Sequence, residues 1–381
     1  MEKQKHLIVV AGEASGDMHA AHLVSAIRTL NPSIKFSGVG GEQMQNAGVE
    51  LYENLADLAV VGFIEVIKHF GEFQRIFNLI IKKVEETKAD AVILVDYPGF
   101  NLRLAKALKE KKIKVIYYIS PQVWAWKENR IAFIKQYTDR MLVFFQFEKE
   151  FYAQRGVTVD FVGHPLLDTV KVKAPRDVLL QIANLPQNKL TLGLLPGSRQ
   201  KEVATLLPVM LRAAEILYQE NNKLQFLVLK ASTISEEEIK SFTGRVSFPV
   251  TIVKDQTYDG INACSVCMVA SGTATLETAI LEKPMVVVYK TSLFTWALAK
   301  LFVKIPYIGL VNVVAGKKIV PECIQFNANP KKIAAELKAI FSDEIKIAEI
   351  KLQLKKVRES LGEGGASRRA AEIIVKAISN S

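Results

Sequence analysis

The stretch LIVVAGEASGDMHAAHLVSAI, residues 7–27, joins a run of apolar residues to a glycine-containing loop and then to a helical pattern. The apolar run at residues 7–11 is uninterrupted, which is typical of a strand buried on both faces of a sheet. A buried strand that leads through a short loop into a helix begins a βαβ unit. The stretch therefore predicts an α/β fold with a parallel sheet covered by helices.

The same alternation of strands and helices recurs along the chain in two series. The first has further apolar runs at residues 35–39, 91–96, 115–119, 141–145 and 160–162, and the second has runs at residues 191–195, 225–229, 250–253, 266–269 and 285–289. Between them, around residues 164–190, the periodicity is lost and prolines appear. We therefore expect two Rossmann-like domains, residues 1–168 and 169–350. Helical patterns follow to the end, so residues 351–381 are expected to pack back on the N-terminal domain.

The composition indicates folded domains, because 49% of the 381 residues are hydrophobic and 23% are charged. The 50 basic and 39 acidic residues leave a net charge of +11, which favours an anionic membrane surface or a phosphorylated substrate as partner. No nucleic-acid-binding module is recognisable, so nucleic acid is not expected as a partner. A secretion signal and a membrane-spanning apolar run are also missing, which predicts a cytoplasmic protein with peripheral membrane contact.

Few residues suggest metal or redox chemistry. Cys264 and Cys267 form a C-x-x-C pair, but the sequence nearby offers neither a second ligand pair nor a thioredoxin-like setting, so we interpret them as small buried residues. Asp17, His19 and His22 are close in sequence, yet without a second ligand cluster they do not indicate a metal site. The sequence predicts neither a metal nor another cofactor.

Ligands of such sheets bind beyond the carboxyl ends of the strands, so we expect the active site in a cleft between the two domains. The loop after the first strand carries Glu13 and Asp17, whose charges would repel the pyrophosphate of a dinucleotide. Together with Ser15, this loop is better suited to sugar hydroxyls or to proton transfer. The alternative is an ordinary turn in which Asp17 caps the helix.

Another carboxylate, Asp96, ends the strand at residues 91–96 and precedes a Tyr-Pro-Gly turn. An aspartate at the mouth of an apolar strand is partly desolvated, which raises its pKa and makes it a candidate general base. The alternative is a structural aspartate that accepts hydrogen bonds from the amides of the turn.

The second domain begins with a candidate anion site. The sequence LLPGSRQKEV brings Gly197, Ser198 and Arg199 to the beginning of a helix. Backbone amides, a hydroxyl and a guanidinium together suit a diphosphate group, while the missing P-loop lysine argues against triphosphate hydrolysis.

A similar loop follows a later strand in the sequence ASGTATLE, residues 270–277. Gly272 and Thr273 allow a ligand to approach closely, and Glu277 can pair with ribose hydroxyls. The alternative is a plain helix N-terminus at which an acidic residue is favourable.

The segment at residues 63–84 predicts an amphipathic helix with an aromatic-rich apolar face. The side chains that this face could turn toward a membrane or an acyl chain are Phe63, Ile67, Phe70 and Phe77. Basic residues flank them, as in helices that lie in a membrane interface. The alternative is that the stripe belongs to the core.

Taken together, these loops resemble those of the lipid-A-disaccharide synthase family. Further matching stretches are AGEASGD at residues 11–17, SPQVWAWKENR at 120–130, VGHPLLD at 162–168, and a run from Tyr307 to Gln325. The order and spacing of the set, more than any single stretch, carry the resemblance. Two positions depart from it, because many relatives have an aspartate in place of Gly99 and a proline in place of Val311.

The resemblance implies a GT-B fold and an inverting transfer of 2,3-diacylglucosamine from UDP to 2,3-diacylglucosamine 1-phosphate. It implies a peripheral protein on the cytoplasmic face of the bacterial inner membrane that releases UDP and a β-1,6-linked lipid A precursor. The residues carried over are Asp96 and Glu13 as catalytic groups, Ser15 and Asp17 in the acceptor-side loop, and Ser198, Arg199, Glu277 and Asn312 at the UDP-sugar site.

Several alternatives stay open at this point. One is another UDP-sugar enzyme of the same fold, either an epimerase or a peptidoglycan glycosyltransferase. A nucleotide-dependent oxidoreductase is disfavoured by the missing dinucleotide fingerprint, and a non-catalytic membrane or nucleic-acid adaptor is the remaining class. The choice of base between Asp96 and Glu13, the acyl-chain length and the oligomeric state, a homodimer included, are not decided by the sequence.

Overall fold

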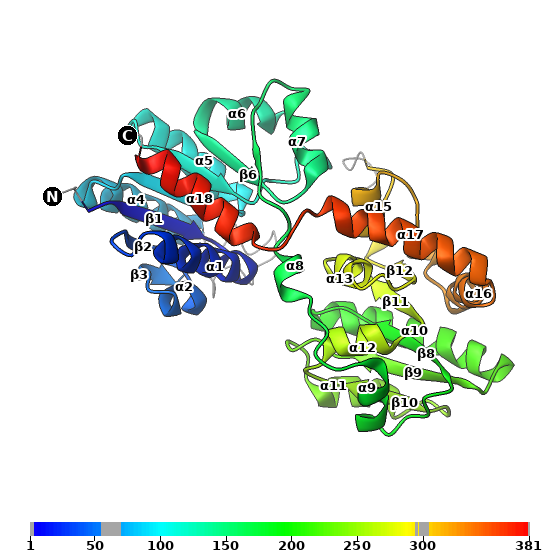
Figure 1. Cartoon of the computed structure of the whole chain (residues 1–381). Coiled ribbons are helices and arrows are strands. Elements are labelled where there is room, and N and C mark those ends of the chain that lie inside the picture. Colours follow the sequence, from blue (N-terminus) through cyan, green and yellow to red (C-terminus); the bar gives the residue numbers. More distant parts are fainter. Residues whose placement is uncertain (1–3, 55–69, 294–295, 297–304, 380–381) are drawn as a thin grey trace. The chain divides into compact units, whose positions relative to one another are not determined.

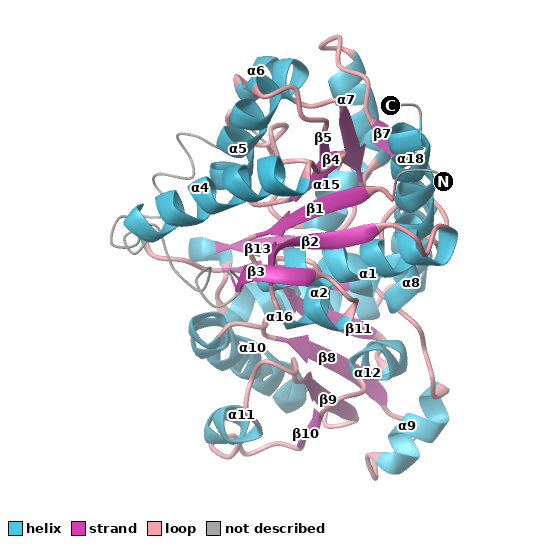
Figure 2. Cartoon of the chain, turned by 90° about the vertical axis from the view of Figure 1, so that its left-hand side faces the viewer, coloured by secondary structure: helices cyan, strands magenta, loops and turns pink. Residues whose placement is uncertain are grey.

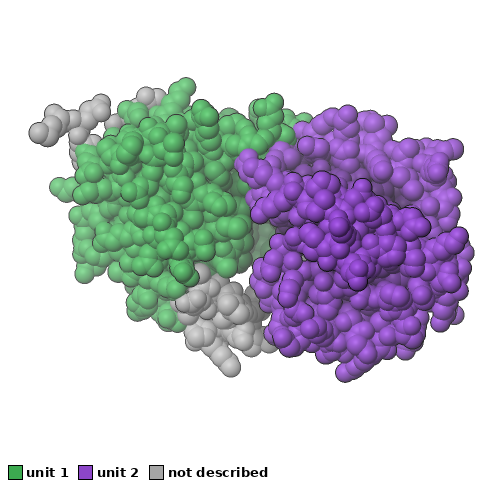
Figure 3. Space-filling model, turned by 60° about the horizontal axis from the view of Figure 1, so that its bottom comes forward, with its two compact units in different colours: residues 1–165, 362–381 green, residues 166–361 purple. Residues whose placement is uncertain are grey.

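The computed structural model describes residues 4–54, 70–293, 296 and 305–379. The chain forms two compact units, unit 1 with residues 1–165 and 362–381, and unit 2 with residues 166–361 (Figure 3). Unit 2 extends beyond the predicted boundary at residue 350, because helix α17 (Glu344–Ser360) continues through it. The final helix of the chain then belongs to unit 1 (Figure 1).

Unit 1 contains a seven-stranded parallel sheet in the order β3-β2-β1-β4-β5-β6-β7. Its strands are β1 (His6–Ala11), β2 (Lys35–Gly40), β3 (Glu50–Asn54), β4 (Ala91–Val95), β5 (Val115–Tyr118), β6 (Arg140–Val143) and β7 (Asp160–Phe161). In the centre of the sheet, Val10 of β1 pairs with Val39 of β2 and with Leu94 of β4. The central strands are apolar throughout because helices cover both of their faces.

The helices of unit 1 are α1 (Ala14–Leu30), α2 (Glu42–Asn46), α4 (Phe70–Thr87), α5 (Pro98–Glu110), α6 (Arg130–Tyr137), α7 (Gln146–Ala153) and α18 (Ala366–Ser379). One core cluster joins residues of α4, α5 and α6 to alternate residues of the strands, such as Ile8 and Val10. Helices α1 and α18 lie side by side, and α1 contacts the central strands (Figure 1). The last helix of the chain thus completes the first unit.

Unit 2 has a six-stranded parallel sheet in the order β10-β9-β8-β11-β12-β13 (Figure 2). Its strands are β8 (Leu190–Leu195), β9 (Leu224–Leu229), β10 (Val250–Val253), β11 (Val266–Ala270), β12 (Met285–Tyr289) and β13 (Glu322–Ile324). Its helices are α8 (Leu166–Thr169), α9 (Arg176–Ile182), α10 (Gln200–Glu220), α11 (Glu236–Thr243), α12 (Thr257–Ala263), α13 (Ala274–Ile280), α15 (Leu310–Ala315), the 3₁₀ turn Gln325–Asn327, α16 (Pro330–Phe341) and α17.

Each sheet reverses its strand order at one place, between β1 and β4 in unit 1 and between β8 and β11 in unit 2. At such a switch point the loops that follow the two strands diverge, which leaves room for a ligand beyond the carboxyl ends. The four loops are residues 12–13, 96–97, 196–199 and 271–273. They contain most of the residues that the sequence predicts for the site.

The predicted α/β class with two parallel sheets is confirmed, and the cysteines agree with the interpretation given above. Cys264 and Cys267 are free and buried, and both sulfurs approach the backbone of β8 at Gly193. A methyl group on that glycine would lie 2.8 and 3.0 Å from the two sulfur atoms. The pair therefore fills the space that the glycine leaves.

The apolar face of α4 belongs to the core of unit 1. Ile76, Ile80 and Val84 are fully buried, and the ring of Phe77 lies 6.0 Å from that of Phe100 on α5. Phe77 is half-buried and packs against this core, so the membrane contact predicted for it stays a prediction. Phe63 and Ile67 lie outside the described residues, as does the side chain of Phe70.

No helix among the residues described combines the length and the hydropathy that crossing a bilayer requires.

Candidate active site

The turn after β4 holds Asp96 in an unusual backbone conformation. Asp96 and Tyr97 are consecutive left-handed residues, with φ angles of 46° and 47°. Such residues cost of order 1 kcal/mol or more each and persist only where the surroundings fix them. The surroundings do so here, since the buried side chain of Asn101 donates to the carbonyl oxygens of Val95 and Asp96 at 3.1 and 2.8 Å.

A second hydrogen bond holds the same carbonyl group from the neighbouring strand. The hydroxyl of Tyr117 on β5 donates to the Asp96 carbonyl oxygen at 2.6 Å. Neither Asn101 nor Tyr117 was singled out from the sequence. Asn101 lies in the first helical turn of α5. Only folding brings its side-chain amide to the carbonyl groups of Val95 and Asp96.

The carboxyl group of Asp96 is half-buried and has a raised pKa of about 6. Burial is the main cause because it disfavours the charged form, and the negative charge of Glu13 adds to it. A backbone hydrogen bond from Tyr97 acts in the opposite direction. The structure thus brings the two predicted carboxylates close enough to influence each other, and it places Asp96 where a base titrates close to neutral pH.

The loop after β1 packs directly against this turn. A methyl group on Gly12 would lie 2.6 Å from Cγ of the Tyr97 ring, so only glycine fits there without displacing the tyrosine. The next residue, Glu13, is the N-cap of α1 and is exposed, as is Ser15. Glu13 and Ser15 are therefore accessible to a ligand.

Asp17 has a structural function in this loop. Its carboxylate is buried and accepts hydrogen bonds from the backbone amides of Gly41, Gln43 and Met44 at 2.8, 3.0 and 3.1 Å. These amides begin α2, so Asp17 caps a helix other than the one that contains it. The bonds occupy both carboxylate oxygens.

The histidines near this loop are part of an aromatic cluster. The ring of Phe144 lies 5.6 Å from that of His19 and 5.4 Å from that of His164. Burial lowers the pKa of His19 to about 4 and that of His164 to about 3, so both rings are neutral at physiological pH. Among the described residues, no three His, Cys, Asp or Glu side chains come together as ligands for a metal.

In unit 2, the loop after β8 presents Ser198 and Arg199 to solvent at the N-terminus of the long helix α10. Gly197 has a φ of 113°, which favours glycine. The backbone amide of Ser198 donates to the Glu202 carboxylate at 3.1 Å. Glu202 was not predicted, although its place three residues after the N-cap is where the acid of a capping box occurs.

The loop after β11 contains the other predicted donor-site residues. Gly272 has open space where a side chain would point, Thr273 is exposed, and Glu277 is half-buried on α13. Burial raises the pKa of Glu277, and the Glu277 charge contributes to the raised pKa of Tyr258, about 12. The loop therefore offers small accessible groups with a carboxylate behind them.

Asn312 is fully buried on α15, and its side-chain amide is saturated with protein partners. Its nitrogen donates to the Val320 carbonyl oxygen and to Glu322, both at 2.9 Å, and its oxygen accepts from the amides of Ile319 and Val320 at 2.8 and 3.1 Å. No hydrogen-bonding capacity is left for a ligand. In this structure Asn312 fixes the loop that leads to β13.

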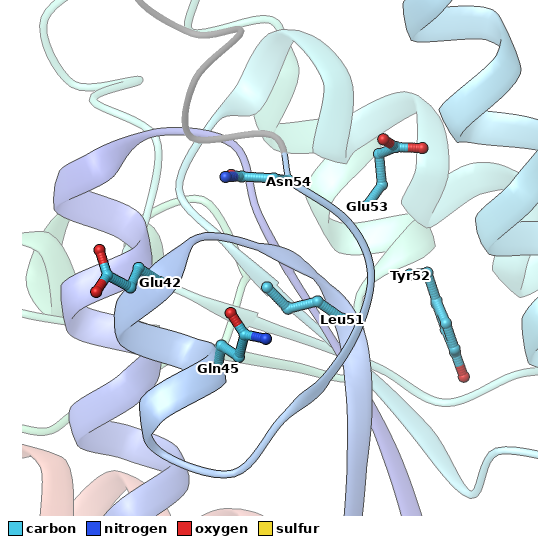
Figure 4. Close-up of a pocket in the computed structure, with 6 residues that line it drawn as sticks. All are labelled: Glu42, Gln45, Leu51, Tyr52, Glu53 and Asn54. Atoms are coloured by element: carbon cyan, nitrogen blue, oxygen red, sulfur yellow. The ribbon is translucent and has the colours of Figure 1, made fainter.

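An open pocket of about 430 Å³ lies elsewhere in unit 1, beside α2 and the edge strand β3. Its lining residues are Glu42, Gln45, Leu51, Tyr52, Glu53 and Asn54. Tyr52 and Glu53 lie on the far side of the strand from Gln45 (Figure 4). None of the predicted site residues lines it, and it is not at the switch point, so we do not assign the chemistry to it.

Comparisons with known proteins agree with this geometry. The family model of lipid-A-disaccharide synthetase matches residues 7–378. The lipid-A-disaccharide synthases of Trichlorobacter lovleyi and Syntrophus aciditrophicus are 43% and 44% identical, and each alignment covers at least 99% of both chains.

Solved structures with little sequence identity share the fold. UDP-GlcNAc 2-epimerase from Neisseria meningitidis, bound to UDP-GlcNAc, aligns with a TM-score of 0.58 at 13% identity and covers 99% of this chain and all of its own. MurG from Acinetobacter baumannii aligns with a TM-score of 0.60 at 13% identity, covering 98% of this chain and 99% of its own. At this identity they show the fold only. The family match and the full-length relatives go further: the chain belongs to the lipid-A-disaccharide synthetase family.

Proposed function

We propose that this protein is an inverting glycosyltransferase that transfers 2,3-diacylglucosamine from UDP to the 6-hydroxyl of 2,3-diacylglucosamine 1-phosphate. The products are UDP and the β-1,6-linked disaccharide 1-phosphate. The observation that carries the mechanism is Asp96, a half-buried carboxyl group with a raised pKa on a strained turn at the switch point of unit 1. Family membership and the full-length relatives support the choice of substrates.

In the proposed reaction the Asp96 carboxylate accepts the proton of the acceptor 6-hydroxyl. The hydroxyl oxygen forms a bond to the anomeric carbon of the donor while the bond from that carbon to the UDP oxygen breaks. Attack from the face opposite UDP inverts the anomeric configuration in one displacement. The negative charge that develops on the diphosphate is stabilised by the exposed Ser198 hydroxyl and Arg199 guanidinium at the N-terminus of α10.

The other predicted residues have supporting functions in this proposal. Glu13 and Ser15 are exposed after β1, Glu13 close enough to Asp96 to raise its pKa, and they can contact acceptor hydroxyls, whereas Asp17 fixes this part of the chain through α2. Gly272, Thr273 and Glu277 receive the nucleoside part of the donor, and Asn312 holds the neighbouring loop from within. Glu202 orients the Ser198 amide so that the hydroxyl and Arg199 face solvent.

The test is an assay with UDP-2,3-diacylglucosamine and 2,3-diacylglucosamine 1-phosphate in detergent micelles without added metal. Wild-type protein should produce disaccharide and UDP. Asp96→Ala should lower turnover by roughly 10²- to 10⁴-fold, the usual contribution of a positioned base, while UDP still binds. Near-normal turnover of this variant would transfer the role of base to Glu13.

The same assay separates the other functions that the fold allows. An epimerase would interconvert a single UDP-sugar without an acceptor, and a peptidoglycan glycosyltransferase would not need acylated sugars. Strict dependence on both acylated substrates is the expected result. Binding of NAD(P) without binding of UDP would instead favour an oxidoreductase.

We further propose that the protein works as a peripheral protein at an anionic membrane surface. The net charge of +11 and the acylated substrates support this. Vesicles that contain anionic lipid should co-sediment with the protein, and salt should release it because ions screen surface charges. Equal binding to neutral vesicles in high salt would contradict an electrostatic attachment.

A further inference from the structure

The loop between β5 and α6 presents an exposed indole with two cations at the same edge of the sheet as Asp96. Its inner side is firmly held. Val123 and Ala125 are buried, and the Trp124 indole nitrogen donates to the buried carboxylate of Glu148 at 3.2 Å. With its neighbours fixed in this way, Trp126 projects outward and is 42% exposed.

Two positive side chains lie over the ring of Trp126. The Lys127 ammonium is 4.3 Å from the ring centroid, and the Arg130 guanidinium carbon is 5.6 Å from it. Cations at such distances are attracted to the face of the ring. The backbone at Lys127 is left-handed, with a φ of 56°, so the chain changes direction there before it reaches Arg130. Both cations therefore lie beside the same exposed indole.

Between these two cations the sequence has one acidic residue, Glu128, and its carboxylate pairs with another cation. The Glu128 carboxylate is paired with Arg155, with contacts of 2.8 Å to Nε and 2.7 Å to the terminal nitrogen. Within the described part of the chain, neither Lys127 nor Arg130 forms an ion pair. Two cations beside one exposed ring, without a carboxylate partner among the described residues, form a site suited to a doubly charged anion such as a phosphate monoester.

The site lies one strand away from the catalytic turn. Strand β5 pairs with β4 along its length, with Tyr118 opposite Val95, the residue before Asp96. Tyr117 of β5 is bonded to the Asp96 carbonyl group, and the positive charge of Arg130 partly offsets the increase of the Tyr117 pKa that burial causes. The loop and the turn thus follow neighbouring strands, which are about 4.8 Å apart, and Arg130 acts on a hydroxyl that is hydrogen-bonded to the Asp96 peptide.

The acceptor in the proposed function has the matching shape. Its 1-phosphate is attached to C1, and its reacting 6-hydroxyl is on C6, the exocyclic carbon attached to C5. Because C1 and C5 flank the ring oxygen, the phosphate and the hydroxyl lie within the dimensions of one sugar. When the hydroxyl lies at Asp96, the phosphate must lie nearby, and its negative charge needs cations that unit 1 provides.

We propose that Lys127 and Arg130, which both lie over the ring of Trp126, bind the 1-phosphate of the acceptor sugar and so position its 6-hydroxyl at Asp96. This inference rests on the proposed function. It assigns the discrimination between a phosphorylated and an unphosphorylated acceptor to the loop after β5.

The test compares 2,3-diacylglucosamine 1-phosphate with the same sugar lacking the phosphate, in phospholipid-free micelles. Arg130→Gln and Lys127→Gln should each raise KM for the phosphorylated acceptor roughly 10- to 100-fold, the usual effect of losing a charge-assisted hydrogen bond. KM for the UDP-sugar should not change, and the preference for the phosphorylated acceptor should decrease by the same factor. Arg130→Lys should restore part of it, since the charge remains without the planar guanidinium.

Lys149→Gln is the matched control, because it removes an exposed positive charge from α7 outside this loop. It should leave both KM values as in the wild type. An unchanged preference for the phosphorylated acceptor in both glutamine variants would overturn the inference and leave the proposed function intact. Absence of disaccharide from the wild-type protein would overturn the proposed function and this inference with it.

Membrane lipids also carry phosphate, and a second arm of the experiment separates the two sources. The same variants are sedimented with vesicles that contain anionic phospholipid. A variant that sediments like the wild type but has lost its acceptor preference supports the sugar phosphate as ligand. A variant that loses vesicle binding and keeps the acceptor preference assigns these cations to the membrane surface and overturns the inference.

Discussion

At the scale of single residues, the proposed base Asp96 destabilises the folded protein when it is ionised. Asp96 is half-buried beside Glu13, so its ionised form is disfavoured and its pKa rises from 3.8 to about 6. A raised pKa of an acid means that the folded state binds the proton more tightly than the unfolded state does. Stability is therefore lost as the pH rises from 3.8 to about 6 and stays lower above that range.

Replacing this carboxyl group by an uncharged amide should consequently stabilise the protein at neutral and alkaline pH. We expect Asp96→Asn to raise the free energy of unfolding by about 1–3 kcal/mol at pH 8, after allowance for the partial exposure of the group. The difference should disappear below about pH 3, where Asp96 is protonated in both states. Urea unfolding at the two pH values measures this, and equal stabilisation at both would show that ionisation is not the cause.

The pH dependence of activity tests the partnership of the two carboxylates. A base with a pKa of about 6 should give kcat/KM an acid limb at that pH. Glu13→Gln removes a negative charge that raises the Asp96 pKa, so the limb should move to lower pH while activity at high pH is retained. Loss of activity at every pH would instead show that Glu13 itself accepts the proton.

Some residues of the site could be predicted from the sequence and others could not. Asp96, Glu13, Ser198 and Arg199 follow strands that are apolar throughout, so their place at the sheet edge could be predicted. The function of a buried polar side chain depends on distant partners. Asp17 caps a helix 25 residues further on, at Glu42, and this pairing leaves no local pattern.

At the scale of elements, the packing of two loops against each other sets the geometry of the turn after β4. Gly12 allows the Tyr97 ring to lie on the backbone of the loop after β1. The turn is strained at Asp96 and Tyr97, so support from its neighbours is needed to keep the carboxylate in place.

Gly12 in this loop and Gly16 in the helix that follows it form a matched pair for a test. Gly12→Ala should displace Tyr97 and lower kcat by one or more orders of magnitude, in line with the ~10²-fold loss that misplacing a catalytic group causes. Gly16→Ala lies inside α1, where the added methyl group would have ordinary contacts of 3.7 Å or more, and it should stabilise the helix by up to about 1 kcal/mol. Steady-state kinetics and thermal unfolding of both variants distinguish the effects. Similar kinetics for the two would argue against the role of the Tyr97 contact.

The strands and helices were predicted well where their pattern was strong and missed where it was weak. The buried central strands appear as continuous apolar runs, and all of them were found. The missed strands are β3, whose sequence ELYEN is mostly polar at the sheet edge, and β13, which has three residues. The apolar face predicted at residues 63–84 could not be assigned from the sequence to the core or to a membrane contact, because both environments favour apolar side chains on one face of a helix.

At the scale of the whole molecule, unit 1 is built from both ends of the chain. Helix α18 lies along α1 and buries Ala370, Ala371 and Ile374. The Lys114 ammonium donates to the Ala377 carbonyl oxygen at 2.6 Å, and Arg369 donates to the Val162 carbonyl oxygen at 2.8 Å. The helix is therefore an integral part of the core of unit 1.

Removing α18 should damage unit 1 and spare unit 2. A chain that ends at Leu361 would expose the apolar side of α1, and we expect loss of the Asp96 site, aggregation and early unfolding of unit 1, with unit 2 still able to bind UDP. Ile374→Asp should act in the same direction, since it places a charge in the core. Glu372→Ala on the exposed side of α18 is the control. Wild-type activity of the shortened chain would contradict this.

The return of the chain to unit 1 also sets an order of completion during synthesis. The first 165 residues leave the ribosome early, but their last helix is made only after residues 166–361. At usual translation rates of about 5–20 residues per second, roughly 10 to 40 seconds pass between the synthesis of residue 165 and that of α18, which covers the apolar side of α1. Unit 1 is begun first and finished last, and a nascent chain of this protein exposes a binding surface for chaperones throughout that interval.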